Sequence, residues 1–82
     1  MANSDENVVL NGNAITTILL GGSTAFIIQN TKNDTLRFKV KDSAVEGGQI
    51  KPGCSSDFDG DIDLWNPTGK PADSIIVYLL RN

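Results

Sequence analysis

Apolar residues recur in this chain as short runs or in alternation with polar residues, and Gly, Pro, Asn and Asp interrupt them at close intervals. This pattern is typical of β-strands joined by turns, and it shows no helical period. It predicts strands over residues 8–10, 14–20, 24–29, 35–41, 49–51, 58–65 and 73–80. We therefore expect one all-β domain over residues 1–82, a small antiparallel β-sandwich or barrel of six to seven short strands. Residues 1–7 are mostly polar and are expected to form a flexible N-terminal arm.

The segment 35–41 has the clearest alternation of apolar and basic residues. Its apolar positions are Leu36, Phe38 and Val40, and the positions between and after them are Arg37, Lys39 and Lys41. Successive side chains of a strand point to opposite faces, so this segment predicts a half-buried strand with a basic outer face. Nucleic-acid-binding sheets interleave aromatic residues with basic ones, whereas Phe38 points to the other face. Together with the net charge of −3, this argues against nucleic-acid binding.

The segment 73–80 is apolar on both of its faces. One face carries Ile75, Val77 and Leu79, and the other carries Ile76, Tyr78 and Leu80. A strand of this kind is usually covered on both sides. In so small a domain we expect the second cover to be another subunit.

Trp65 and Tyr78 are the only Trp and Tyr of the chain. Each fits either the core or an interface, where such residues concentrate binding energy. Trp65 ends a predicted strand beside a proline-containing loop, and it is either an interface anchor or a lid on a small core. The candidate interface residues are Trp65, Tyr78, Arg37, Lys39 and Lys41.

Four carboxylates alternate with other residues in the segment 57–63: Asp57, Asp59, Asp61 and Asp63. In an extended chain they share one face, and clustered carboxylate oxygens suit calcium. The spacing matches the calcium loop of helix-loop-helix proteins poorly, because Ile62 and Thr68 occupy positions that need Gly and Glu. Two other interpretations stay open: a solvated strand face, or pairing with the basic face of residues 37–41.

Length and composition limit the chemistry of the chain. A domain of 82 residues has a thin core, and the single Cys54 and the lack of histidine exclude an internal disulfide and a Cys/His zinc site. We expect Cys54 to be a small, partly buried thiol, because no imidazole is present to activate it. The start of the chain lacks the pattern of a secretion signal, and no apolar run is long enough to span a membrane. Synthesis in a reducing cytoplasm is the expectation, with no cofactor and no membrane partner.

Three stretches carry a family resemblance. They are Phe-Ile-Ile-Gln-Asn-Thr at 26–31 leading into 35–40, Ile-Lys-Pro-Gly at 50–53, and Leu-Trp-Asn-Pro at 64–67 leading into 74–80. Their order resembles small β-sandwich virion proteins of tailed bacteriophages, of the capsid decoration (cement) and head–tail accessory kind. The resemblance implies a protein that assembles on the virion and stabilises the shell or attaches another component. Its partners would be capsid or other virion proteins and further copies of itself, with a trimer favoured.

Three hypotheses follow from the sequence. The first is a phage structural protein without enzymatic activity, made in the host cytoplasm and located in the virion. The second is a carbohydrate- or calcium-binding β-sandwich module whose site includes residues 57–63. The third is a minimal hydrolase, which we rank last because so short a β domain has little room for a walled cleft.

Overall fold

The computed structural model describes residues 4–81, and this part of the chain folds into eight β-strands. The strands are β1 (Ser4–Asn11), β2 (Thr16–Ile18), β3 (Phe26–Gln29), β4 (Leu36–Val40), β5 (Gly48–Ile50), β6 (Ser55–Phe58), β7 (Ile62–Trp65) and β8 (Ser74–Arg81). Within residues 4–81 there is no helix long and apolar enough to cross a membrane. The expected all-β class is confirmed.

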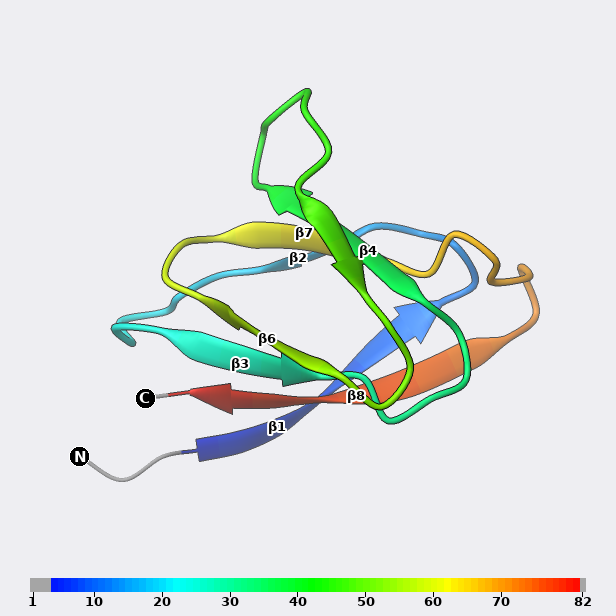
Figure 1. Ribbon diagram of the computed structural model, residues 1–82, viewed down its shortest axis with the longest axis horizontal. Helices are drawn as coiled ribbons and strands as arrows, with labels where there is room; N and C mark the ends of the chain where they lie inside the picture. The colour runs from blue at the N-terminus through cyan, green and yellow to red at the C-terminus, as the bar shows by residue number, and fades with distance from the viewer. Residues whose placement is uncertain (1–3, 82) are drawn as a thin grey trace.

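The strands form two four-stranded antiparallel sheets that lie one over the other (Figure 1). Sheet A has the order β1-β8-β3-β6, and sheet B has the order β2-β7-β4-β5. Only β4 and β5 are consecutive neighbours in one sheet, and every other connection crosses from one sheet to the other. This strand order is that of a jelly roll, in which eight strands form a double sheet through two Greek keys.

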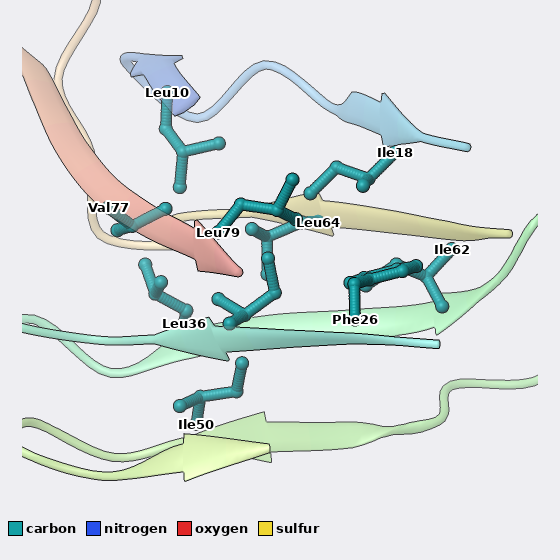
Figure 2. Close-up of a cluster of buried hydrophobic side chains, with 10 residues drawn as sticks. Leu10, Ile18, Phe26, Leu36, Ile50, Ile62, Leu64, Val77 and Leu79 are labelled. Atoms are coloured by element: carbon teal, nitrogen blue, oxygen red, sulfur yellow. The ribbon is translucent and has the colours of Figure 1, made fainter. Parts of the chain in front are cut away.

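The core lies between the sheets and consists of the inward side chains of both (Figure 2). Its buried members are Leu10, Ile18, Phe26, Ile28, Leu36, Ile50, Ile62, Leu64, Val77 and Leu79. Phe58 contributes aromatic contacts at the β6 edge, with ring centroids 5.4 Å from Phe26 and 4.8 Å from Phe38. The second contact is nearly perpendicular, which is a favoured aromatic geometry.

Strand β8 lies inside sheet A, hydrogen-bonded to β1 on one side and β3 on the other. Its inward residues Val77 and Leu79 are fully buried, whereas Ile76 and Tyr78 point outward and are 45% and 49% exposed. The prediction that this segment has two apolar faces is therefore confirmed, and one of the two faces is open.

The single strand predicted over residues 58–65 is wrong. The chain leaves sheet A after Phe58, bends at Asp59 and Gly60, and enters sheet B at Ile62. A sandwich of this topology needs such a crossing, and a glycine inside an apparent strand is a signal for it. The crossing yields two strands where one was expected, so the count is eight and not six to seven.

The arm predicted over residues 1–7 is also wrong for its second half. Residues 4–7 belong to β1 and pair with residues 78–81 of β8, while residues 1–3 lie outside the described part. The length of β8 explains the difference, because its eight residues offer hydrogen-bonding groups along the whole of β1.

Two single-residue predictions need correction. Val40 was placed with Leu36 and Phe38 on the core side, but it is 64% exposed at the end of β4, where the 41–47 loop leaves the sandwich (Figure 1). Cys54 was expected to be partly buried, and its thiol is exposed in the turn that follows Gly53.

Two buried asparagines fix the loops at one end of the sandwich. The Asn30 amide nitrogen donates hydrogen bonds to the carbonyl oxygens of Asp34 and Ile50, at 2.7 and 2.9 Å. The Asn66 amide nitrogen donates to the Asp34 carboxylate at 2.9 Å, and its oxygen accepts hydrogen bonds from Thr68. These bonds satisfy polar groups that would otherwise be buried without partners.

Candidate functional site

The outer face of sheet A carries a continuous set of apolar side chains. We call it the apolar face; its members are Val9 on β1, Ile27 on β3, and Ile76, Tyr78 and Leu80 on β8. Val9 lies opposite Ile76, and Ile27 lies opposite Leu80, so the set runs diagonally across the three strands. Val9, Ile76 and Tyr78 are each close to half exposed, and Ile27 and Leu80 are partly covered by their neighbours.

The surroundings of the apolar face are polar and mostly neutral. Asn7 and Gln29 lie on either side of Tyr78 in the register, and Ser74 and Asn11 form the next pair beyond Ile76 and Val9. Two acidic residues lie at the opposite end: Asp57, next to Ile27, and Asp5, the register partner of Leu80. A ring of amide and hydroxyl groups around an apolar centre is the usual composition of a protein–protein interface.

The outer face of sheet B is mostly polar, with Trp65 as its aromatic member and the exposed Ile15 and Leu19 on either side of β2. Its polar side chains bond to one another. The Thr17 hydroxyl donates to the Asp63 carboxylate at 2.7 Å, and the Lys39 ammonium lies 3.8 Å from the other Asp63 oxygen. Thr17, Asp63 and Lys39 are also register partners across β2, β7 and β4. This confirms, for one carboxylate, the predicted pairing of acidic and basic residues within a sheet.

The remaining basic residues of the 35–41 segment also have acidic partners. The Arg37 guanidinium forms an ion pair with Glu46. The Lys41 ammonium donates a hydrogen bond to the Asp42 carboxylate at 2.9 Å, and this bond raises the pKa of Lys41 and lowers the pKa of Asp42. Both partners of the second pair are exposed, so its contribution to stability is small.

The structure distributes the predicted interface residues over different surfaces. Of the five, only Tyr78 lies on the apolar face. Trp65, opposite Arg37, lies on the outer face of sheet B and is half-buried, as is Lys39. Lys41 lies in the loop after β4. The sequence prediction missed Val9, although the run Val8-Val9-Leu10 on one strand necessarily turns an apolar side chain outward.

The four alternating carboxylates do not share a face. Asp57 belongs to β6 of sheet A, Asp59 and Asp61 lie in the crossing, and Asp63 belongs to β7 of sheet B. The Asp61 carboxylate accepts a hydrogen bond from the Leu20 backbone amide at 2.8 Å, and the Asp63 carboxylate is engaged by Thr17. Nowhere in residues 4–81 do three acidic or thiol side chains gather closely enough to hold a metal ion.

Calcium is therefore expected to leave the thermal stability of the chain unchanged. A ligand that binds only the folded state raises the melting temperature by mass action, so millimolar CaCl₂ tests the site directly. Asp59→Asn is the matched variant, and we expect it to melt at the same temperature as the parent chain with or without calcium. A calcium-dependent rise in the parent that Asp59→Asn abolishes would restore the metal site.

A hollow of about 510 Å³ opens at the loop end of the sandwich. Its lining includes Asp34, Asn66, Thr68, Lys70 and Asp73. Asp34, Asn66 and Thr68 already bond to one another, which makes them part of the loop framework. The hollow is consequently a weaker candidate for a binding site than the apolar face.

Arg81 closes the opposite end of the sandwich. Its guanidinium forms an ion pair with Glu6 of β1 and donates hydrogen bonds to the carbonyl oxygens of Leu19 and Leu20 at 2.5 and 2.8 Å. It also lies 5.9 Å from the centre of the Phe26 ring, within the range of a cation–π contact. These contacts connect sheet A to the chain that follows β2, and the sequence gives no local signal for them.

The fold and its surfaces define a small jelly-roll β-sandwich in which the outer face of sheet A has an apolar centre and the outer face of sheet B is mostly polar. No family model, curated protein or solved structure matches this chain.

Proposed function

We propose that this protein is a non-catalytic assembly subunit that binds another protein through the apolar face of sheet A. The observation that carries the proposal is the contrast between the two sheets. Outward positions of a β-sandwich are normally polar, and sheet B follows that rule at Thr17, Asp63 and Lys39, with Trp65 as the exception. Sheet A departs from it with Ile76 and Tyr78 in an interior strand, which is the pattern of a strand covered on both sides.

The particular assembly that we propose is the virion of a tailed bacteriophage, as a capsid decoration or head–tail accessory subunit. The resemblance of residues 24–80 to such proteins supports it. The jelly-roll strand order gives further support, because viral capsid domains use this architecture. Lectins use it as well, so the support from the fold is analogy and the surface chemistry has to decide.

The absence of catalysis is part of the proposal. The chain has no histidine to act as a base, and its thiol lies exposed in a turn. Asp61 and Asp63 accept hydrogen bonds from Leu20 and Thr17, and these bonds tie β2 and the segment after it to β7 and the end of the crossing. These groups therefore serve the fold, and the distinctive chemistry of the surface is its apolar face.

Purified particles test the proposal. Particles from induced cultures of a strain that carries the gene would be banded in a density gradient and analysed by quantitative mass spectrometry. We expect peptides of this chain in the DNA-containing band, in a fixed ratio to the major capsid protein. If this chain is absent from that band but present in the soluble fraction of the same lysate, the result would contradict the virion assignment.

A further inference from the structure

The apolar face requires a cover of limited size. Strands β1 and β8 have eight residues each and β3 and β6 have four. With strands about 4.8 Å apart and about 3.3 Å per residue, the sheet face covers roughly 400 Å². Two such faces packed together bury about 800 Å² in total, which is below the roughly 1,200 Å² of stable interfaces and is the size of a weak, transient one. A second copy of the sheet thus supplies enough area for a weak, reversible dimer, and the two faces match in outline because they are the same surface.

The charges of the face suit a second copy in one orientation. The central positions are neutral, so two copies meet there without like-charge repulsion despite the net charge of −3. The end of the face at Asp57 and Asp5 is acidic, and the end at Ser74 and Asn11 carries only hydroxyl and amide groups. A twofold axis perpendicular to the strands places the acidic end of one copy over the neutral end of the other. An axis parallel to the strands would bring the two acidic ends together, which is unfavourable.

We propose that the apolar face is covered by a second copy of this chain, related by a twofold axis that passes near Tyr78 and runs perpendicular to the strands. This proposal rests on the proposed function, because it identifies the protein that the face binds. Tyr78 lies near the axis because it is the central outward residue of β8, between Ile76 and Leu80. The assembly is an isologous dimer, in place of the trimer that the sequence favoured.

The dimer leaves other surfaces free for the particle. The outer face of sheet B, with Trp65 and Arg37, is on the side of the sandwich opposite to sheet A. The 41–47 loop projects from the sandwich beyond sheet B, with Val45 74% exposed (Figure 1). Self-association through one sheet is therefore compatible with attachment through the other.

Mass measurement over a range of concentrations is the first test. Sedimentation equilibrium of the parent chain is expected to approach twice the chain mass of 8.8 kDa as concentration rises. Ile76→Thr combined with Tyr78→Thr places threonine, a residue that suits strands, at each position and should weaken dimerisation at least about tenfold. Val45→Thr makes a similar change outside the face and should leave dimerisation unchanged. Circular dichroism at low concentration verifies that each variant is folded.

Cross-linking tests the position of the axis. Facing sheets pack about 10 Å apart, which is too far for a disulfide but within reach of a short bis-maleimide. In a Cys54→Ser background, Tyr78→Cys should give a cross-linked dimer, and Val45→Cys should give none. A monomer at every concentration, a trimeric mass, or a dimer cross-linked at Val45 and not at Tyr78 would each overturn the proposal.

The particle experiment separates this inference from the proposed function. A parent chain that is monomeric in solution but present in particles refutes the dimer and leaves the virion assignment intact. A chain that dimerises through Tyr78 but is absent from particles refutes the virion assignment and supports the dimer.

Discussion

Phe26→Ala is expected to lower the free energy of unfolding by about 4 kcal/mol, since truncation of a buried phenylalanine removes apolar burial and leaves a cavity. Phe26 is fully buried in β3, where it contacts the Phe58 ring on one side and the Arg81 guanidinium on the other. A chain of 82 residues has a total stability of about 4–12 kcal/mol, so this loss removes between about a third and all of that stability. Urea titration followed by circular dichroism measures it.

Phe26→Leu and Val45→Ala are the controls for this prediction. Leucine preserves most of the apolar volume, so we expect Phe26→Leu to cost about 1 kcal/mol. Val45→Ala removes an exposed side chain and should change stability by less than about 0.5 kcal/mol. Equal losses for Phe26→Ala and Val45→Ala would mean that Phe26 does not belong to the core in solution.

Gly69→Ala is expected to destabilise the chain by about 3 kcal/mol through a backbone clash, at the upper end of the range for overpacking. A Cβ atom on Gly69 would lie 2.0 Å from the carbonyl oxygen of Gly12, and backbone atoms cannot rotate away. Gly12 itself has a φ of 54° and lies at the turn after β1. Relief of the clash requires the loop after β7 to separate from the turn between β1 and β2.

Gly60→Ala is the matched control for that substitution. A Cβ atom on Gly60 meets no atom within 4 Å, and its φ is not in the left-handed region. We expect the change to be neutral or to stabilise the chain by up to about 1 kcal/mol, because alanine restricts the unfolded state. Should both variants melt at the temperature of the parent chain, the close approach of Gly12 and Gly69 is not present in solution.

Local patterns in the sequence were sufficient to predict the faces of individual strands. The alternation in 35–41 placed Leu36 and Phe38 toward the core and Lys39 outward, and the two apolar faces of 73–80 led directly to Tyr78. These predictions succeeded because the side-chain period of a strand is a local property of the backbone.

The alternation in 57–63 led to the wrong prediction of a single strand, again because the side-chain period is a local property. Asp57 and Asp63 are spaced as if on one strand, but the chain changes sheets between them at Asp59 and Gly60. A period of two cannot show a crossing, and only the glycine marked the place. The calcium interpretation of these four carboxylates, one of three that the sequence left open, depended on that single strand, and the carboxylates share no common face.

The hydrogen bonds that hold the loops at Asn30 and Asn66 could not be predicted from local sequence patterns. Asn30 bonds to a carbonyl oxygen 20 residues away, and Asn66 bonds to a carboxylate 32 residues away. Both asparagines fit ordinary turns in the sequence, and their burial follows only from the pairing of distant strands. The strand order of the jelly roll is non-local in the same way.

The most direct test of the account is the solvent accessibility of Tyr78, which is the only tyrosine and lies on the apolar face. Hydroxyl-radical labelling would be carried out on dilute and on concentrated protein. The extent of labelling at Tyr78 would be compared with that at Trp65, the only tryptophan, which lies on the outer face of sheet B. We predict that labelling of Tyr78 falls as the protein associates, while labelling of Trp65 does not change. Unchanged labelling of Tyr78 in the associated protein, or protection of Trp65 in its place, would contradict the account.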